Sequence, residues 1–539
     1  MLKRELRIDH RYLILPVRRR TAAEARGQWG GNMRLCRDGQ VLRHFDIDLA
    51  DGSGDYQVFS DLQPFLGQRL QVEFEGTGAA SLDGLRLAAE PVPPESLYRE
   101  RLRPQFHFSS RRGWNNDPNG LFCFGGEYHL LYQHNPYSVE WGNLHWGHAV
   151  SRDLVHWTER PVALYPDELG AMSTGCAVVD SDNTSGLGSA GAPAIVAVYT
   201  AGHASWTPGF VQCLAISTDG GTTWSKYDGN PVIEHIVHRN RDPKVIWHPQ
   251  TERWVMVLYM DRFDYAIFTS PNLLQWERVS DLELPRCTEC PELFPLALDG
   301  EQKWVFWGAN TTYLVGSFDG RTFRPEQGPR KLQPDGNGYA AQTWSDVPAE
   351  DGRRIQMAWL RQQMPGMPFG QCMTVAHSLR LQRRGGQVLL TADPVRELES
   401  LRVERWQVAD TEIAPARPLE AEVSGELLDV EVELELGSAD CVGVVVRGVP
   451  VFYDRRLGAL CCGGYTVPMP APDGPFTWRI LADRASLELY ADGGAVNIAA
   501  GVILPEWERS VRLVAAGGSA VAKRVTVARL RSAWPLAEV

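Results

Sequence analysis

The 539-residue sequence predicts an all-β protein, in which a five-bladed β-propeller lies between a small N-terminal β-domain and a C-terminal β-sandwich. Three observations support this fold class. Apolar residues almost never recur at helical spacing, short apolar and aromatic segments alternate with Gly, Asp and Pro, and one strand pattern recurs five times in the middle of the chain. A chain of this length also exceeds one ordinary hydrophobic core, so several domains are expected.

The N-terminal β-domain is expected over residues 1–95. Its segments 12–17 (YLILPV) and 69–76 (RLQVEFEG) are interpreted as strands with the alternating pattern of half-buried sheet. The stretch 92–104 is rich in Pro and charged residues, and we interpret it as a break between this domain and the next.

The middle domain is expected over residues 104–388, because a strand that ends on an aromatic residue recurs there. From each final aromatic to the next, the spacings are 67, 60, 48 and 52 residues. The five segments are EYHLLY (127–132), AIVAVY (194–199), RWVMVLY (253–259), KWVFW (303–307) and RRIQMAW (353–359). After four of them comes a Ser followed by a turn with Asp or Asn and then an aromatic residue. Such repeats are typical of propeller blades of four strands, and an array of β-sandwiches with a chance likeness is the alternative.

The C-terminal domain is expected over residues 400–539, after a second break at 391–401 (TADPVRELESL). The segment 428–436 (LDVEVELEL) alternates strictly, as a half-buried strand does. The segment 478–494 reads as strand, turn, strand and Gly turn, so a sandwich is predicted.

Composition excludes several classes of partner. The net charge is −12, from 54 basic and 66 acidic residues, and no dense Lys/Arg block occurs, which disfavours nucleic acid. No apolar stretch is long enough to span a bilayer, so no membrane partner is expected. No signal segment is seen and the ten Cys are scattered, which favours reduced thiols in a cytoplasmic protein. A neutral ligand fits this chain best, and the oligomeric state is left open.

Three acidic residues fall at equivalent places, at the start of the innermost strand of blades one, three and four. They are Asp117, Asp242 and Glu289, each one or two residues before a Pro. Blades two and five have polar, uncharged segments there, at 173–176 and 338–344. Three carboxylates around one axis repel each other, so a fold keeps them mainly for chemistry or for a cation.

Among these uses, glycoside hydrolysis needs one carboxylate nucleophile and one carboxylic acid that donates a proton, and a third carboxylate can bind sugar hydroxyls. Calcium is the alternative, but it takes six to eight oxygens and the usual Gly-rich acidic loop is missing. Zinc at Cys287-x-x-Cys290 lacks a second pair of ligands. We expect neither a metal nor a cofactor.

The same residues carry a resemblance to the invertase, inulinase and levanase family, glycoside hydrolase family 32. The motifs are WNNDPNG (114–120), YHLLYQHNP to WGNLHWGHAVSRDLVHW (128–157), RDP (241–243) and ECPELF (289–294). The likeness continues through GYAAQTW, PVRELESL and RILADRASLELYADGG, and it covers roughly residues 105–535. It implies a five-bladed propeller packed on a β-sandwich, with the N-terminal 90 residues outside the usual two domains.

The resemblance implies a retaining glycosidase, favoured to be exo-acting, that releases fructose from sucrose, fructo-oligosaccharides, levan or inulin by double displacement. Asp117 would be the nucleophile, Asp242 the transition-state stabiliser and Glu289 the acid/base. The residues expected to contact substrate are Asn116, Gln133, Trp141, Thr174, Arg241, Tyr339 and Trp359, with Trp146 as a further candidate.

Alternatives stand beside several of these residues. Asp117 could belong only to a tight turn, Arg241 and Asp242 could be a structural ion pair, and Glu292 is a rival acid. In the catalytic interpretation, the positive charge of Arg241 is expected to keep Asp242 ionised. At the level of function, a fructosyltransferase with the same covalent intermediate and a non-catalytic fructan-binding protein are the rivals.

The sequence departs from the family pattern at four places. Asn115 replaces the usual Met, and Thr174-Gly175 replaces Ser-Gly. The segment 337–340 has Asn-Gly-Tyr-Ala where Asp-Phe-Tyr-Ala is usual, and the loop 362–381 lacks the usual Arg-Glu-Leu. Substrate preference among sucrose, inulin and levan is therefore left open.

Overall fold

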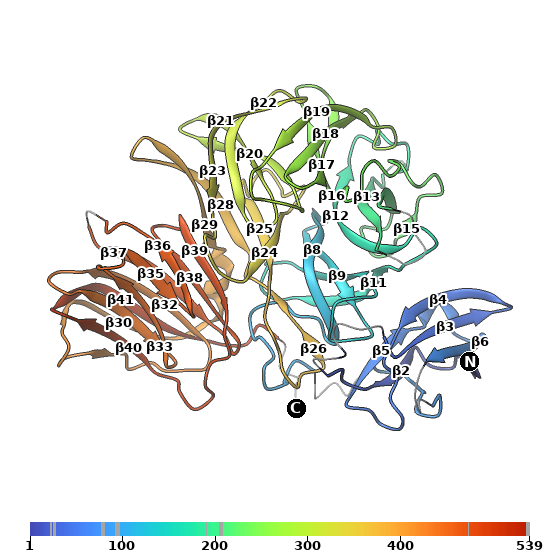
Figure 1. Ribbon diagram of the computed structural model, residues 1–539, viewed down its shortest axis with the longest axis horizontal. Helices are drawn as coiled ribbons and strands as arrows, with labels where there is room; N and C mark the ends of the chain where they lie inside the picture. Colours follow the sequence, from blue (N-terminus) through green and yellow to red (C-terminus); the bar gives the residue numbers. More distant parts are fainter. Residues whose placement is uncertain are drawn as a thin grey trace.

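The computed structural model describes residues 1–21, 24, 29–76, 81–91, 97–189, 191–203, 209–472 and 474–534. It confirms the predicted fold class. Figure 1 shows the N-terminal sheets at one end of the molecule, the propeller in the middle and the sandwich at the other end. Helical structure in the described ranges is confined to short 3₁₀ turns, such as η2 (Gln63–Phe65) and η4 (Arg396–Leu401). No helix in this part of the chain is long and apolar enough to cross a membrane.

Two sheets form the N-terminal domain. The strand order of the first sheet is β1 (Leu2–Arg7), β6 (Arg69–Gly76), β3 (Gly31–Arg37) and β4 (Gln40–Asp46). The order of the second sheet is β5 (Tyr56–Asp61), β2 (Tyr12–Val17) and β7 (Arg86–Ala88). β6 alternates as predicted, but β2 is buried along its whole length, so the prediction of alternation was wrong there. Because β2 is the central strand of its sheet, Leu13 and Leu15 pack in the domain core while Tyr12 lines a small cavity shared with propeller residues.

The propeller consists of five antiparallel sheets, each with four main strands. From the innermost strand outwards, the first three sheets are β8 (Gly113–Phe124), β9 (Glu127–Asn135), β10 (His145–Ser151) and β11 (Thr158–Leu164); β12 (Ala171–Asp180), β13 (Ala194–Gly202), β14 (Val211–Ser217) and β15 (Ser225–Lys226); and β16 (Arg241–His248), β17 (Arg253–Asp261), β18 (Asp264–Ser270) and β19 (Glu277–Glu283).

The last two sheets are β20 (Glu292–Leu298), β21 (Glu301–Trp307), β22 (Thr312–Phe318) and β23 (Phe323–Lys331); and β24 (Gly338–Thr343), β25 (Arg354–Leu360), β28 (His377–Arg384) and β29 (Gln387–Pro394). Two short strands, β26 (Phe369–Gly370) and β27 (Cys372–Met373), pair with β8 and β25. The five strands that the repeat predicted are the second strands of the sheets, so the strand before each lies innermost, as expected.

The Ser-Asp turns that recur after these strands are structural, as predicted. In the first sheet the Asp153 carboxylate accepts the backbone N–H groups of Val155 (3.0 Å) and His156 (2.8 Å). Asn272 does the same for Leu274 and Gln275 in the third sheet. Each turn thus satisfies backbone donors where a strand ends.

The C-terminal domain is a sandwich of two six-stranded sheets. They are, in order, β30 (Arg402–Ile413), β41 (Ala520–Leu530), β32 (Leu428–Glu435), β37 (Phe476–Ala482), β38 (Ser486–Ala491) and β39 (Val496–Gly501); and β31 (Leu419–Glu420), β40 (Val511–Ala516), β33 (Cys441–Val446), β34 (Val449–Asp454), β35 (Ala459–Cys462) and β36 (Tyr465–Pro468). Inward Val, Leu and Ile side chains of both sheets form one core.

A buried ionic cluster joins the propeller to the sandwich. His107 lies 2.8 Å from the carboxylates of both Asp483 and Glu488, and all three side chains are almost fully buried. Burial alone lowers the pKa of His107, but the two carboxylates outweigh it and raise this pKa to about 9. The cluster therefore contains a charged histidine at neutral pH.

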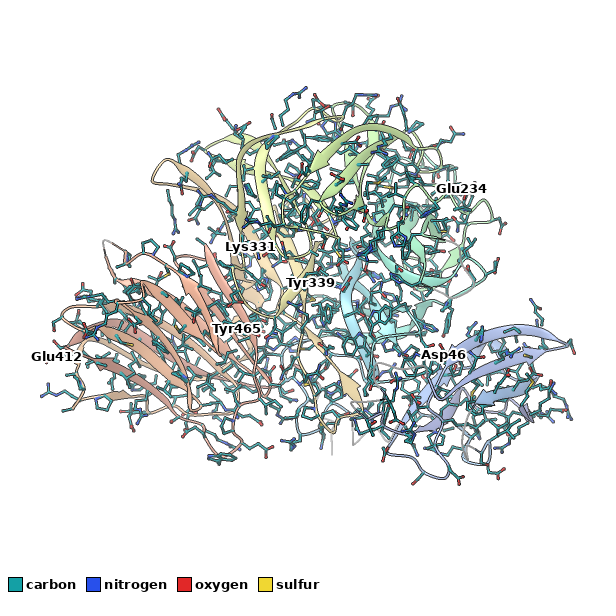
Figure 2. The ribbon with its side chains drawn as sticks, in the orientation of Figure 1. Asp46, Glu234, Lys331, Tyr339, Glu412 and Tyr465 are labelled. Carbon is teal, nitrogen blue, oxygen red and sulfur yellow. The ribbon has the colours of Figure 1, made fainter. Side chains whose placement is uncertain are left out.

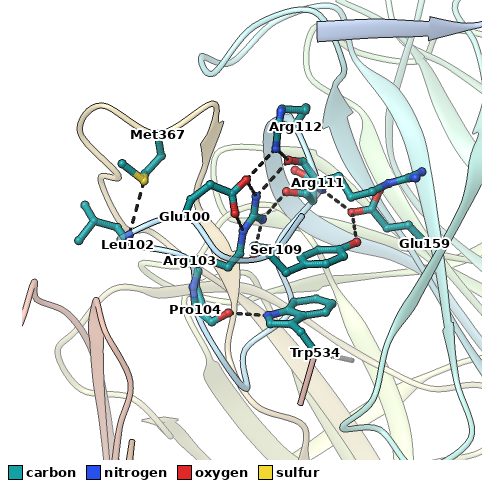
Figure 3. Close-up of polar contacts among 12 residues, drawn as sticks. Glu100, Leu102, Arg103, Pro104, Ser109, Arg111, Arg112, Glu159, Met367 and Trp534 are labelled. Carbon is teal, nitrogen blue, oxygen red and sulfur yellow. Dashed lines mark hydrogen bonds and ion pairs between the residues drawn. The ribbon is translucent and has the colours of Figure 1, made fainter. Parts of the chain in front are cut away.

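The segment predicted as a break, 92–104, is described from residue 97, and its residues 92–96 lie outside the described part. Figure 3 shows that the rest is held by polar contacts. Glu100 accepts two hydrogen bonds from Arg103 (both 2.9 Å) and one from Arg112 (2.7 Å). At the end of the sandwich, Trp534 donates to the carbonyl oxygen of Pro104 (2.6 Å). Residues 97–104 of this connection are therefore held by specific contacts.

Candidate active site

A pocket of about 210 Å³ opens at one end of the propeller channel. It is lined by the three candidate acids and by seven of the eight residues expected to contact substrate, all except Trp146: Asn116, Asp117, Gln133, Trp141, Thr174, Arg241, Asp242, Glu289, Tyr339 and Trp359. Leu144, Ser173 and His203 complete the lining; Leu144 and Ser173 lie in segments that the sequence analysis quoted but were not singled out, and His203 lies outside every quoted motif. The propeller therefore brings together side chains that are up to 243 residues apart in the chain (116 to 359).

Irregular strand pairing places these side chains. The register between the innermost strand and its neighbour shifts between Asn115 and Pro118 in the first sheet, and at 172–175, 241–244 and 339–342 in the second, third and fifth. A β-bulge bends the strand and redirects a side chain. Asp117, Thr174 and Asp242 all lie inside such bulges. Pro118 and Pro243 fit there because proline cannot donate to the ladder.

Left-handed backbone conformations accompany the bulges. Asp242 (φ +63°), Glu289 (φ +63°) and Cys290 (φ +40°) all lie in the region that non-glycine residues rarely adopt. Strain of this kind costs on the order of 1–3 kcal/mol per residue and concentrates where a fold must present particular side chains. Two of the three candidate carboxylates are thus placed at an energetic cost that the rest of the fold offsets.

Asp117 accepts a hydrogen bond on each carboxylate oxygen. Asn116 Nδ2 donates to Oδ1 (3.1 Å), and Thr174 Oγ1 donates to Oδ2 (2.7 Å). Gln133 Nε2 in turn donates to Thr174 Oγ1 (3.2 Å), and Trp114 Nε1 donates to Asn116 (2.9 Å). Burial raises the pKa of Asp117, while the Thr174 and Asn116 donors lower it. This arrangement orients one carboxylate rigidly, which a nucleophile requires.

Asp242 is the most buried of the three acids, with 5% of its surface exposed. Its Oδ2 accepts the backbone N–H of Cys290 (3.2 Å), and its own N–H donates to Thr200 (2.9 Å). Burial raises the pKa of Asp242 to about 7; Arg241 opposes the shift, and Glu289 and Asp117 add to it. Arg241 was expected to keep Asp242 ionised; it does lower the pKa of Asp242, but desolvation outweighs the cation, so this pKa stays above its ordinary value.

Glu289 is more accessible than Asp242, with 30% of its side chain exposed. Arg241 Nη2 donates to its Oε1, and the Tyr339 hydroxyl donates to its Oε2 (2.7 Å). Arg241 Nε lies 3.6 Å from Asp242 Oδ2, so one guanidinium bridges two acids. The ion pair between the adjacent residues Arg241 and Asp242, proposed from the sequence, exists. It is the longer of the two ion pairs that Arg241 makes.

Cys290 shows how closely the acids converge. Its Sγ lies 3.7 Å from Asp117 Oδ2 and 3.6 Å from Asp242 Oδ2. The Cys287 thiol instead donates to Asn310 Oδ1 (2.9 Å), and it does not share the partners of the Cys290 thiol. The two cysteines thus have different neighbours, and no cluster of three or more His, Cys, Asp or Glu that could hold a metal ion occurs among the described residues.

Glu292, the rival acid, is fully buried in the channel below the pocket. It pairs with Lys244 Nζ (2.9 Å) and accepts the hydroxyl of Thr343 (2.7 Å). Lys244 also donates to the backbone carbonyl of Thr343 (2.7 Å). This closed ionic group does not line the pocket, so its role is structural.

The remaining predicted contacts differ in kind. Trp141 stands half exposed at the pocket mouth (51%), and Trp359 is held by a hydrogen bond from its Nε1 to Gln371 (3.1 Å). Gln133 Oε1 is buried with no hydrogen-bond partner among the described residues, so it can accept from a ligand hydroxyl. The prediction that Trp146 contacts sugar was wrong, because its side chain is fully buried and its Nε1 donates to the Ser173 carbonyl (3.0 Å).

Asn337 stands where the family usually has Asp, and it does not line the pocket. Its Oδ1 accepts the Tyr465 hydroxyl (2.6 Å) and the Gly501 N–H (2.7 Å), both from the sandwich. In Figure 2, Tyr339 and Tyr465 lie on facing parts of the propeller and the sandwich. The substitution thus serves the domain contact beside Tyr339.

Comparisons with known proteins agree with this geometry. The family model described as glycosyl hydrolases family 32 N-terminal domain matches residues 107–392. A levanase of Bacillus subtilis (strain 168) is 37% identical over 495 residues, 81% of this chain and 72% of that protein. An extracellular exo-inulinase of Aspergillus ficuum is 30% identical over 520 residues, 81% of this chain and 96% of that protein. The crystal structure of an exo-inulinase from Aspergillus awamori matches with a TM-score of 0.74 at 28% identity, over 81% of this chain and 100% of that one.

Proposed function

The chain belongs to glycoside hydrolase family 32, and we propose that it uses Asp117, Asp242 and Glu289 to release fructose from β-D-fructofuranosides. The protein is a glycosidase of fructans and sucrose, since its relatives are levanases, exo-inulinases and invertases. The assignment of chemical roles to individual residues is the proposal. The observation that supports it is the meeting of three carboxylates from three blades at one pocket.

In the first step, a carboxylate oxygen of Asp117 forms a bond to the anomeric C2 of the fructosyl unit. The bond from C2 to the leaving oxygen breaks, and Glu289 gives its proton to that oxygen. Thr174 and Asn116 keep the attacking carboxylate in one orientation through their hydrogen bonds. A fixed reacting geometry of this kind removes much of the entropic part of the barrier.

In the second step, water forms a bond to C2 and the bond from C2 to Asp117 breaks. Glu289, now a carboxylate, takes the proton of the water, so the acid of the first step is the base of the second. Arg241 and Tyr339 hydrogen-bond to Glu289, and they fix the direction in which it meets the leaving group and the water. Two displacements at one carbon retain the β configuration.

Asp242 binds the hydroxyl groups of the fructosyl ring in this scheme. It is buried beside both other acids, and the bridging Arg241 is its ion-pair partner. Hydrogen bonds from ring hydroxyls to this carboxylate strengthen as positive charge develops on the ring, so they stabilise the transition state more than the substrate. Asp242 is therefore a binding group for the reacting ring and not the nucleophile.

The test is a pair of isosteric variants, Asp117→Asn and Glu289→Gln. Each should lower kcat on sucrose or inulin by about 1000-fold or more, because each removes an indispensable group. Asp219→Asn, in an exposed turn of the second sheet, is the matched control and should be as active as the wild type. Wild-type turnover by Asp117→Asn would refute the assignment.

Substrate range is proposed as exo-cleavage of sucrose, fructo-oligosaccharides, levan or inulin, with free fructose and the substrate shortened by one fructosyl unit as the early products. Chromatography of the products from sucrose, inulin and levan tests it. Oligosaccharides longer than the substrate would instead indicate transfer to a sugar hydroxyl. We also propose a cytoplasmic location, which is supported by ten cysteines that form no disulfide in the described structure.

A further inference from the structure

One segment at the pocket mouth connects the active site to the N-terminal domain. Residues 136–144, here called the rim loop, join β9 to β10. The rim loop brings Trp141 and Leu144 to the pocket. Trp141 is half exposed at the mouth of the pocket that contains the three acids, so it can contact the part of a substrate beyond its terminal fructosyl unit.

The end of the rim loop is hydrogen-bonded to β4 of the N-terminal domain. Asn143 Oδ1 accepts the backbone N–H of Asp46 (2.8 Å), and Asn143 Nδ2 donates to the Asp46 carbonyl (2.9 Å). At the start of the loop, Tyr137 stacks on Phe45 with ring centroids 3.6 Å apart. Figure 2 places Asp46 where the N-terminal domain meets the propeller. Both ends of the loop are thus fixed by adjacent residues of one strand.

The residues on either side of Trp141 contact the same domain. A Cβ atom on Gly142 would lie 2.8 Å from the indole of Trp29, and Gly142 has φ +148°, so only glycine allows this approach. Arg20 lies over the Trp29 ring (4.6 Å) and pairs with Glu140 (3.2 Å). The backbone immediately before and after Trp141 is therefore positioned by the N-terminal domain.

The family match begins at residue 107, so these contacts come from outside the matched domain. We propose that the N-terminal domain is a specificity-determining part of the active site, in which Trp29 is a positioning residue that holds Trp141 against the leaving group of the substrate. This inference rests on the proposed function. It assigns the N-terminal domain a role in substrate binding and none in the chemical step.

The experiment compares Trp29→Ala, Trp141→Ala and the double variant on the substrate that the wild type hydrolyses best. Trp29→Ala should raise KM by about 5- to 20-fold and change kcat less than about 2-fold, because a lost positioning contact weakens ground and transition states alike. In the Trp141→Ala background the same substitution should have almost no further effect. Trp507→Ala, at a tryptophan of the sandwich that is 87% exposed, is the matched control and should leave KM unchanged.

Two results overturn the inference: an unchanged KM in Trp29→Ala, or a KM increase that is as large with Trp141→Ala as without it. Should Trp29→Ala lose its thermal transition, Arg20→Met replaces it, because this change removes the ion pairs to Glu140 and Asp48 and the stacking on Trp29 but keeps the indole. The conservative Trp29→Phe should restore most of the wild-type KM. A wild type without activity on any fructoside would refute the proposed function, whereas an active wild type with uncoupled tryptophans refutes only this inference.

Discussion

Removal of one hydroxyl, in Thr174→Val, tests how the candidate nucleophile is held. Thr174 donates a 2.7 Å hydrogen bond to Asp117 Oδ2, and the only other side-chain oxygen or nitrogen donor that contacts this carboxylate among the described residues is Asn116. A hydrogen bond to a charged group contributes about 1.5–3 kcal/mol. Since 1.36 kcal/mol corresponds to a tenfold change in rate, kcat/KM should fall by about 10- to 150-fold.

The same variant should shift the pH dependence in a defined direction. The Thr174 hydroxyl lowers the pKa of Asp117 against the effect of burial, so its loss raises this pKa further. A nucleophile acts as the carboxylate, and activity is lost as pH falls through its pKa; the acid limb of kcat/KM should therefore move to higher pH. Initial rates on sucrose from pH 3 to pH 8 measure both effects.

Controls distinguish this loss from general damage to the propeller. Thr174→Ser keeps a hydroxyl and should retain most of the activity and the wild-type acid limb. Thr269→Val, at a buried threonine of β18 outside the pocket, should leave kcat/KM within about 2-fold. A Thr174→Val protein with wild-type rate and an unmoved acid limb would refute the claim that this hydroxyl supports the nucleophile.

Three further outcomes follow from the contacts of the described residues. Tyr339→Phe removes a 2.7 Å donor to Glu289 and should lower kcat about 10-fold, measured on sucrose; equal kcat would contradict its orienting role. The buried ionic cluster of His107, Asp483 and Glu488 stabilises the fold below pH 6.5. This stabilisation, on the order of 3 kcal/mol, is lost as pH rises through the raised pKa of His107, about 9. His107→Gln should therefore abolish that alkaline part of the fall in Tm, and an unchanged Tm profile would contradict it. Lys244→Met leaves a buried carboxylate unpaired and should cost about 3–5 kcal/mol in urea unfolding, most of it recovered by adding Glu292→Gln; an additive loss would show that the pair is not coupled.

Much of the fold could be predicted because the propeller repeats its pattern. Five aromatic-ended strands identified the second strand of every propeller sheet, and counting back from them located Asp117 and Asp242 on innermost strands and Glu289 three residues before one. Pro118 and Pro243 were visible as motif residues, but the bulges they occupy were not predicted. A bulge depends on how a strand pairs with its neighbour, which single-strand periodicity does not encode.

Contacts between distant segments were missed for a related reason. Arg241 was paired with Asp242 because they are adjacent, whereas its terminal nitrogen reaches Glu289, 48 residues later in the chain. Trp29 packing on Gly142 and Tyr465 donating to Asn337 join different domains. No local pattern marks such pairs, so only the folded arrangement reveals them. His203, in edge contact with Trp141 at 5.8 Å, belongs to the same class.

The stereochemistry of the first product tests the central claim most directly. NMR spectra recorded during the first turnovers of a β-fructofuranoside should show β-D-fructofuranose appearing first, before it equilibrates in water, because two displacements at C2 retain the configuration. Initial formation of α-D-fructofuranose would show a single displacement by water, and Asp117 could not then be the nucleophile.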